Sequence, residues 1–183
     1  IGICCPAGFI TAEDIQPALQ KLAEWGFNAK IGNTIGKKDF TYGGTDEERL
    51  NDLQQMLDDK TISAILFARG GYGGVRIIDK LDFKKYKRTP KWIIGFSDAT
   101  IFHSHINQNY RIASIHSKMC NSFPNDWSKA EPLQKETIES INQCLKGEKM
   151  KYFFPPNEKN KTGLATGELV GRNLKTLESL AGS

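Results

Sequence analysis

Residues 91–100 read Lys91-Trp92-Ile93-Ile94-Gly95-Phe96-Ser97-Asp98-Ala99-Thr100. A short apolar run ends in Gly-x-Ser-x-Ala, and a segment of helical composition follows it. This order predicts a strand, a tight turn and a helix, with Ser97 at the apex of the turn. The first backbone N–H groups of a helix have no partner within the helix, so at such a turn they can stabilise an oxyanion. Ser97 is therefore the first candidate for a nucleophile.

Segments of strand and helix character alternate along the chain on both sides of this turn. Strands are expected near residues 1–5, 27–31, 62–68, 92–96 and 112–115. Helices are expected after the caps Thr11 and Thr45, and over residues 75–81, 98–108, 132–145 and 173–180. Strands that alternate with helices predict an α/β fold, with a mostly parallel, Rossmann-like sheet flanked by helices.

The composition changes near residue 146, where this alternation stops. Residues 147–163 contain Phe153-Phe154-Pro155-Pro156 and several Lys and Asn residues, which is typical of a linker. We therefore predict an N-terminal α/β domain over residues 1–146 that carries the nucleophile, followed by a linker over residues 147–163. Residues 164–183 are expected to begin a truncated second domain, with the remainder absent from the chain.

The composition also narrows the classes of partner. The net charge is only +4, and the basic cluster at residues 84–88 is expected to be a solvated loop, so nucleic-acid binding is not expected. No apolar run reaches the ~18 residues that span a membrane, and no signal peptide is visible. The four cysteines form no C-x-x-C pair, which argues against a metal site or a disulfide framework. Reduced thiols are typical of a cytoplasmic protein.

A glycine-rich segment follows the strand expected at residues 62–68. It reads Arg69-Gly70-Gly71-Tyr72-Gly73-Gly74. Because ligands bind at the carboxyl ends of parallel strands, this segment and Ser97 are expected at one edge of the sheet. The N–H groups of Gly71 and Asp98 are the candidate oxyanion donors. Two alternatives stay open: a tight turn without a ligand, and a dinucleotide site, although no full G-x-G-x-x-G is present.

A nucleophilic serine needs a base and a group that orients the base. His103 and His105 lie on the helix that follows Ser97 and are expected to point along it and away from the hydroxyl. His116 follows the strand expected at residues 112–115 and fits a substrate-pocket or packing residue better than the base. Asp98 is adjacent to Ser97 and cannot orient a base from there. Residue spacing alone therefore predicts a nucleophile and a donor loop without a complete triad.

Four segments occur in a recognisable order. They are Pro6-Ala7-Gly8, Ala68-Arg69-Gly70-Gly71-Tyr72-Gly73, Ile94-Gly95-Phe96-Ser97-Asp98-Ala99-Thr100 and Gly167-Glu168-Leu169-Val170-Gly171-Arg172-Asn173-Leu174. Together they resemble the LD-carboxypeptidase family of serine peptidases, which includes murein tetrapeptide carboxypeptidases and the microcin C self-immunity peptidase. The resemblance implies a two-domain enzyme whose C-terminal domain supplies a glutamate and then a histidine. Neither lies in this chain, so the chain alone is expected to be nearly inactive.

The resemblance also implies a reaction, the hydrolysis of an amide that joins an L-centre to a terminal D-amino acid. In peptidoglycan recycling, this releases D-alanine from a cytoplasmic muropeptide. By the same resemblance, Ser97 attacks the carbonyl carbon, the N–H groups of Gly71 and Asp98 hold the oxyanion, and no metal or other cofactor is needed. The residues expected to contact the substrate are Gly70, Tyr72, His116 and Asn173. A muropeptide or small peptide is the expected partner, and the likeness suggests a homodimer.

The chain departs from the family pattern at two positions beside the expected substrate. Ser117-Lys118 follow His116 where Gly-Pro is usual, and Gly171-Arg172-Asn173 stands where Gly-Gly-Asn is common. Two alternative functions therefore stay open. One is an immunity peptidase that cleaves an aminoacyl-nucleotide antibiotic. The other is a non-catalytic domain that holds a nucleotide or a peptide through its glycine segment.

Overall fold

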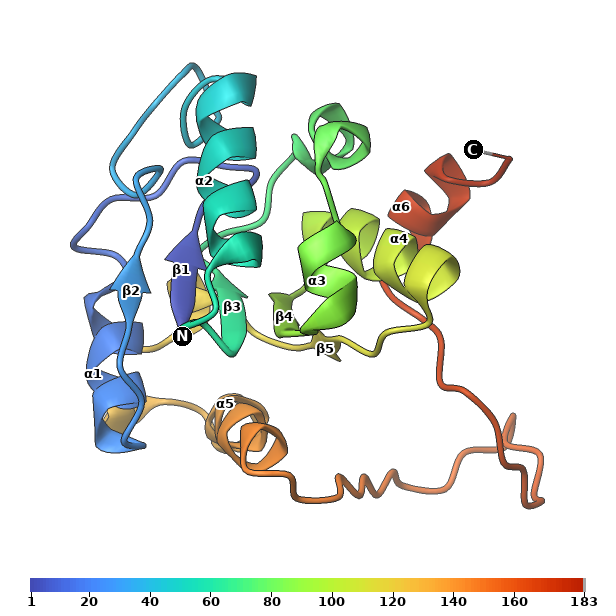
Figure 1. Cartoon of the computed structure of the whole chain (residues 1–183). Helices are drawn as coiled ribbons and strands as arrows, with labels where there is room; N and C mark the ends of the chain where they lie inside the picture. The colour runs from blue at the N-terminus through green and yellow to red at the C-terminus, as the bar shows by residue number, and fades with distance from the viewer. Residues whose placement is uncertain (183) are drawn as a thin grey trace.

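The computed structural model describes residues 1–182 and has a five-stranded parallel sheet at its centre (Figure 1). The strand order is β2-β1-β3-β4-β5, and every neighbouring pair is parallel. The strands are β1 (Gly2–Cys4), β2 (Lys30–Ile31), β3 (Ala64–Phe67), β4 (Trp92–Gly95) and β5 (Ile115–His116). The predicted α/β class is therefore confirmed.

Helices cover both faces of the sheet, because successive residues of each strand point to opposite faces. The helices are α1 (Gln16–Glu24), α2 (Asp46–Asp58), α3 (Lys84–Arg88), α4 (Thr100–Tyr110), α5 (Pro132–Leu145) and α6 (Leu174–Ser179). On one face, buried side chains of α2, α3 and α4 pack with Ile65 and Ile93. On the other face, side chains of α1 and α5 pack with Leu66 and Ile94.

Side-chain caps fix the starts of the first two long helices. Thr45 and Glu48 form the reciprocal capping box that the sequence predicts at the start of α2. Thr11 and Asp14 also exchange side-chain-to-backbone hydrogen bonds, of 3.1 and 3.3 Å, but they close a turn ahead of the helix. Helix α1 therefore begins at Gln16, later than its predicted cap indicates.

Three short segments differ from their predictions. Residues 75–81 form two 3₁₀ turns, Gly74–Arg76 and Ile78–Lys80, where one helix was expected. The basic cluster expected as a loop is helix α3, because Tyr86 is buried within it and donates a 3.0 Å hydrogen bond to the carbonyl of Lys91. The strand expected at residues 112–115 is paired only over Ile115–His116.

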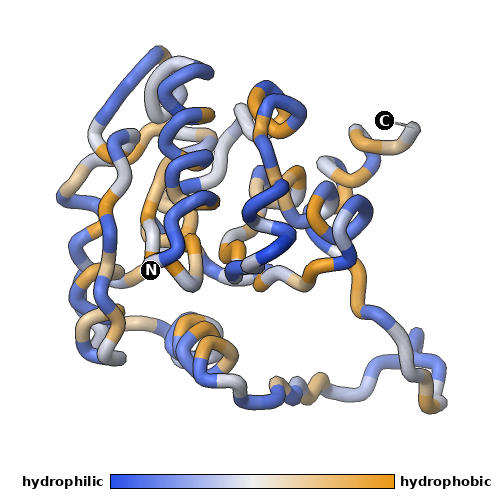
Figure 2. The backbone as a smooth tube through the Cα atoms, in the orientation of Figure 1, coloured by the Kyte–Doolittle hydropathy of each residue, from blue (hydrophilic) through white to orange (hydrophobic). Residues whose placement is uncertain are grey.

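The chain after α5 runs away from the sheet and returns at α6, which packs beside α4 (Figure 1). Apolar side chains along this path, such as Phe153 and Leu164, are exposed, and Figure 2 shows apolar positions along this segment as well as in the core. Helix α5 ends at Leu145. The division into residues 1–146, 147–163 and 164–183 stays a prediction.

None of the helices within residues 1–182 combines the length and the apolar character needed to cross a bilayer.

Candidate active site

Ser97 lies in a strained turn between β4 and α4. Its φ is +58°, a left-handed backbone conformation that costs a non-glycine residue about 1–2 kcal/mol. The 3₁₀ turn Ser97–Ala99 follows directly and leads into α4. The side chain is half-buried, so the hydroxyl lies at the carboxyl edge of the sheet and outside the apolar core. A strained serine between a strand and a helix has the geometry of a nucleophile elbow.

The glycine turn, residues 69–74, approaches Ser97 closely. A Cβ on Gly70 would lie 3.1 Å from the Cβ of Ser97 and 3.3 Å from its Oγ. Gly71 has a φ of +117°, and a Cβ there would lie 3.3 Å from the backbone nitrogen of Gly8. That nitrogen donates a 2.9 Å hydrogen bond to the carbonyl of Gly70. Glycine at positions 70 and 71 therefore allows the loop after β1, the glycine turn and the turn at Ser97 to approach one another.

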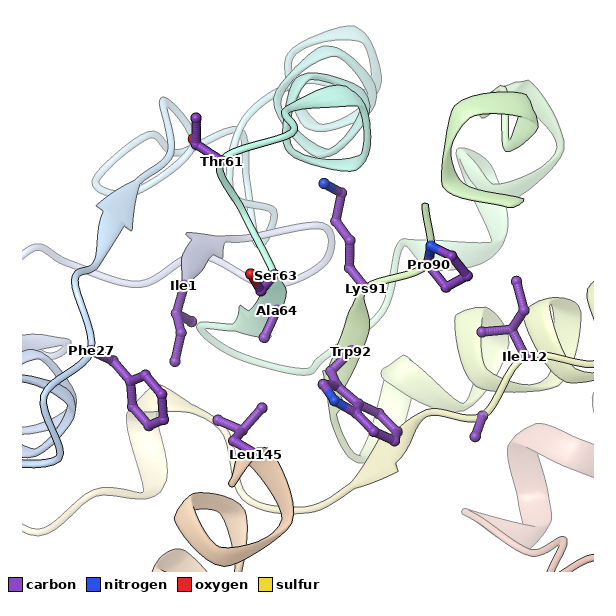
Figure 3. Close-up of a pocket in the computed structure, with 11 residues that line it drawn as sticks. Ile1, Phe27, Thr61, Ser63, Ala64, Pro90, Lys91, Trp92, Ile112 and Leu145 are labelled. Carbon is purple, nitrogen blue, oxygen red and sulfur yellow. The ribbon is translucent and has the colours of Figure 1, made fainter. Parts of the chain in front are cut away.

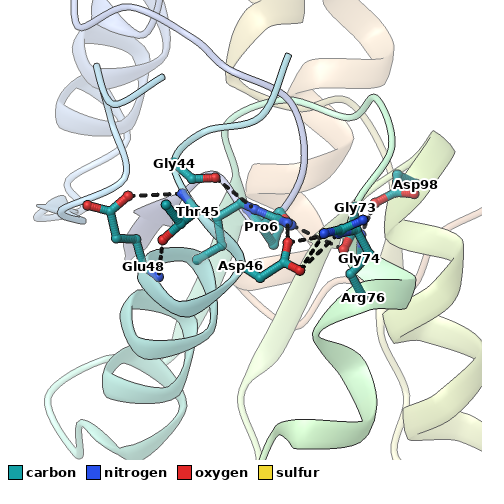
Figure 4. A network of polar contacts seen from close by, with 10 residues as sticks. Pro6, Gly44, Thr45, Asp46, Glu48, Gly73, Gly74, Arg76 and Asp98 are labelled. Carbon is teal, nitrogen blue, oxygen red and sulfur yellow. Dashed lines mark hydrogen bonds and ion pairs between the residues drawn. The ribbon is translucent and has the colours of Figure 1, made fainter. Parts of the chain in front are cut away.

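A buried guanidinium holds the far end of the glycine turn through the backbone of Pro6 and Gly73, both labelled in Figure 4. Arg49 is fully buried and donates hydrogen bonds to the carbonyls of Pro6 at 2.6 Å and Gly73 at 3.1 Å. Its charge is paired with Asp46, which also binds Arg76 at 2.8 Å. Arg49 thus ties helix α2 to the loop after β1 and to the loop after β3.

The carboxylate of Asp98 holds the glycine turn from the other side. Its Oδ2 accepts a 2.8 Å hydrogen bond from the N–H of Gly74, and the side chain is buried. Burial raises the pKa of Asp98, while the Gly74 N–H and the charge of Arg49 act in the opposite direction. The residue directly after Ser97 therefore connects the serine turn, residues 95–99, to the glycine turn.

The sequence analysis did not identify Arg49 or the Asp98 carboxylate as part of this arrangement. For Arg49 a signal was available, because it precedes Leu53 and Met56 at i+4 and i+7 on the buried face of α2. A charged residue on an apolar helix face needs internal partners. Asp98 carried no comparable signal, since a carboxylate in the first turn of a helix is common on surfaces.

The histidines lie beside the serine turn without bonding to it. His103 is fully buried, and its Nε2 donates a 2.9 Å hydrogen bond to the carbonyl of Gly95. Burial lowers the pKa of His103 to about 4, so it is neutral at pH 7. The ring of His105 lies 5.1 Å from that of Phe83. Within residues 1–182 no side chain forms a hydrogen bond with the hydroxyl of Ser97.

The residues predicted to contact the substrate fall into two groups around Ser97. Gly70 and Tyr72 belong to the glycine turn, and the side chain of Tyr72 is 59% exposed. His116 ends β5 and is paired in register with Gly95, two residues before Ser97. Asn173 caps α6, and its N–H donates a 3.3 Å hydrogen bond to Oγ1 of Thr100. The structure thus brings all of these residues to one edge of the sheet.

A separate pocket of about 580 Å³ opens at the amino ends of the strands (Figure 3). Its lining includes Phe27, Trp92 and Leu145, and its one charged side chain is Lys91. The ammonium of Lys91 donates to the carbonyls of Asp59 and Ile62, the latter at 2.8 Å. Lys91 therefore secures a turn, and this pocket brings no further reactive group to the site around Ser97.

Comparison with known proteins agrees with this architecture. Residues 1–117 match the family described as LD-carboxypeptidase N-terminal domain. The probable murein peptide carboxypeptidase of Bacillus subtilis is 32% identical over 183 residues, and the murein tetrapeptide carboxypeptidase of Pseudomonas aeruginosa is 26% identical over 188 residues. Both alignments cover 100% of this chain, and they cover 57% and 60% of the two relatives.

Solved structures share the fold. The microcin C7 self immunity protein MccF in complex with aspartyl sulfamoyl adenosine has a TM-score of 0.80 at 23% identity, over 100% of this chain and 62% of that chain. The muramoyltetrapeptide carboxypeptidase from Oxalobacter formigenes has a TM-score of 0.67 at 24% identity, over 79% of this chain and 48% of that chain. The chain spans about three fifths of the length of its curated relatives. Since the family match covers well over half of its residues, the chain belongs to the LD-carboxypeptidase family.

Proposed function

We propose that this chain is the serine-bearing part of a carboxypeptidase that hydrolyses an L,D-amide bond and releases terminal D-alanine from a muropeptide. The observation that carries the proposal is the strained Ser97, whose φ is +58°, with its Oγ 3.3 Å from the Cβ position of Gly70. The murein peptide carboxypeptidases among the relatives supply the substrate class. We place this reaction in peptidoglycan recycling in the cytoplasm, as the family resemblance implies.

In the proposed mechanism, Oγ of Ser97 attacks the carbonyl carbon of the residue before the terminal D-alanine. The N–H groups of Gly71 and Asp98 donate to the oxyanion that forms. The general base takes the proton of the Ser97 hydroxyl and gives it to the amine of D-alanine, which leaves as the intermediate collapses. Water then hydrolyses the acyl-enzyme to the free carboxylic acid and restores the Ser97 hydroxyl. The family resemblance assigns the general base to a histidine, oriented by a glutamate, in the C-terminal domain of the whole protein. Residues 147–163 are proposed as the linker to that domain, which begins at residue 164.

The buried contacts around the glycine turn support this assignment of the oxyanion donors. Arg49 and Asp98 fix Gly73 and Gly74 by hydrogen bonds of 3.1 and 2.8 Å, so the N–H groups of the turn are oriented before a substrate arrives. Oxyanion stabilisation depends on donors that need no reorganisation during the reaction.

A second candidate function is cleavage of an aminoacyl nucleotide. It is favoured by the structural likeness to MccF, which has been solved in complex with aspartyl sulfamoyl adenosine and with adenosine monophosphate. Both candidates use the same nucleophile on an amide-type bond, and they differ in the leaving group. Turnover of a tetrapeptide ending in D-alanine, compared with turnover of an aminoacyl nucleotide, separates them.

The test replaces Ser97 with alanine in the whole protein that contains this chain. Release of D-alanine from a muropeptide tetrapeptide is expected to fall by at least about a thousandfold, because the covalent route is lost. Ser63→Ala, at an exposed position remote from the glycine turn, is the matched control and is expected to keep full activity. Unchanged release by Ser97→Ala would remove Ser97 from the mechanism. Tight nucleotide binding without turnover by the unmodified protein would favour a non-catalytic binding domain.

A further inference from the structure

Two imidazoles and a guanidinium lie on the β5 side of the turn at Ser97. The ring of His116 lies 6.2 Å from that of His103. The charge of Arg172 acts on both imidazoles and, after burial, contributes to lowering their pKa values. Lys118 lies on the same side, with its Nζ 5.6 Å from the ring centroid of Phe96. His103 of α4, His116 of β5 and Arg172 of the segment before α6 therefore lie near one another, and Lys118, after β5, lies over Phe96 next to Ser97.

The hydrogen-bonding groups of Arg172 are only partly satisfied by the described residues. The Nε of Arg172 is buried and has no hydrogen-bond partner within residues 1–182. Glu168 is the acidic group whose charge acts on Arg172, and its Oε1 accepts a hydrogen bond from the side chain of Asn107. A buried N–H of a guanidinium is costly to leave unpaired. Part of the hydrogen-bonding capacity of this guanidinium is therefore unused within residues 1–182.

Arg172 and His116 also line a cavity that has room for a ligand. Its volume is about 620 Å³, and it is bounded by β5, α5 and the segment that returns to α6. Most of its remaining lining is apolar or weakly polar, including Ile115, Tyr152 and Val170. An apolar cavity with a few convergent polar groups is the usual form of a small-molecule subsite.

The two basic side chains flank the serine turn by independent contacts. His116 is paired with Gly95, two residues before Ser97. Arg172 directly precedes Asn173, whose N–H is bonded to Thr100, three residues after Ser97. In a carboxypeptidase substrate, the terminal carboxylate is separated from the scissile carbonyl by a single residue, about 4 Å of chain. A group that binds this carboxylate must therefore lie beside the nucleophile.

We propose that Arg172 and His116 form the subsite that binds the free α-carboxylate of the terminal residue of the substrate. This inference rests on the proposed function and adds the anchor that would restrict cleavage to the last residue. A guanidinium binds a carboxylate through two parallel hydrogen bonds, which fixes the orientation of the anion as well as its charge.

The experiment compares two peptides and three variants in the whole protein that contains this chain. One peptide is a muropeptide tetrapeptide with a free terminal D-alanine, and the other is the same peptide ending in D-alaninamide. Arg172→Gln is expected to raise KM for the free acid by about 10- to 100-fold with little change in kcat, because a charge-assisted bond is lost from binding. Hydrolysis of the amide is expected to be unchanged. Arg88→Gln, at an exposed position on α3, is the matched control.

The outcomes separate this inference from the proposed function. If Arg172→Gln leaves the preference for acid over amide as it is in the unmodified protein, the subsite is refuted while the carboxypeptidase function stands. If the unmodified protein cleaves neither peptide, both proposals fail. Should the glutamine variant not fold, Arg172→Lys carries the test, because it keeps the charge and loses the planar fork. Its KM for the acid must then rise by a smaller factor, again without an effect on the amide.

Discussion

The two sides of Ser97 differ in how their polar groups are satisfied. On the glycine-turn side, Arg49 and Asp98 are buried, and they bind Gly73 and Gly74 by hydrogen bonds within the chain. On the β5 side, His116 is exposed and the Nε of Arg172 lacks a partner among the described residues. The buried polar groups on the glycine-turn side therefore have hydrogen-bond partners within the chain, whereas a donor on the β5 side has none among the described residues.

This difference matches two separate requirements of a hydrolytic site. Donors that stabilise a transition state must be held in place beforehand, so that no energy is spent on reorganisation during the reaction. A group that recognises a substrate must be open until the substrate arrives, and its unpaired donors are then satisfied by the ligand. Variants on the two sides should accordingly have different effects, with stability and kcat affected on the glycine-turn side and KM on the β5 side.

The largest expected effect is that of Arg49→Met. The substitution removes the donor to three buried carbonyls, those of Pro6, Gly44 and Gly73. The free energy of unfolding is expected to fall by about 3–5 kcal/mol, because buried acceptors lose their partner. Chemical denaturation of the whole protein measures it. Arg76→Met is the matched control, because Arg76 binds the same Asp46 from an exposed position and should cost about 1 kcal/mol or less.

If Arg49→Met and Arg76→Met lose the same free energy of unfolding, the contrast between the two sides of Ser97 is contradicted. Buried Arg49, with its bonds to carbonyl groups, would then stabilise the protein no more than an exposed ion pair does. A large loss confined to Arg49→Met would establish that the glycine turn is fixed from α2.

Asp98 tests the same side of the site at its contact with the serine turn. Asp98→Ala leaves the N–H of Gly74 without its 2.8 Å partner, which is expected to cost about 1–3 kcal/mol of stability. Because the turn loses its fixed position, kcat for D-alanine release should fall while KM changes little. Steady-state kinetics and denaturation of the same protein measure both quantities. A rise in KM alone would place Asp98 on the recognition side.

Asp98→Asn is the informative companion, because an amide oxygen can still accept from Gly74. Burial raises the pKa of Asp98, so the native state holds its proton more tightly than the unfolded chain does. The contribution of Asp98 to stability is therefore greatest at low pH and declines as pH rises through the raised pKa. The asparagine variant should lack this decline and at pH 7 should be at least as stable as the unmodified protein. A loss of stability equal to that of Asp98→Ala would show that the charge itself is needed.

Much of this structure could be predicted from local sequence. The alternation of elements gave the parallel sheet, the Thr45–Glu48 pair marked the start of α2, and residues 132–145 form α5 as expected. Ser97 follows one apolar run, and the glycines of residues 70–74 follow another. These two patterns located the serine turn and the glycine turn, which lie close together in the structure. These signals are local because strand, turn and helix preferences act within a few residues.

The contacts that hold the turns together could not be predicted in the same way. Arg49 binds Pro6 across 43 residues of chain and Gly73 across 24, and no spacing rule gives such pairs. The length of strand β5 and the start of α1 were also wrong by several residues, because pairing and a preceding turn set them. The proposed roles of Tyr72 and Asn173 toward a substrate stay predictions.

The smallest expected effect concerns His103, which lies where the two sides meet. Burial lowers the pKa of His103 to about 4, so the native state binds its proton less readily than the unfolded chain. The stability that depends on neutral His103 is therefore complete above pH 6.5, the ordinary histidine value, and is lost as pH falls toward 4. Between pH 6.5 and 5.5 the free energy of unfolding should fall by at most about 1.4 kcal/mol.

His103→Gln keeps a donor for the carbonyl of Gly95 and should flatten the dependence of the free energy of unfolding on pH. His105→Gln, which changes a less buried ring, should leave most of that pH dependence in place. If the free energy of unfolding has the same pH dependence in the unmodified protein and in His103→Gln, the imidazole of His103 is already solvated. The β5 side of Ser97 would then be open to water as far as α4.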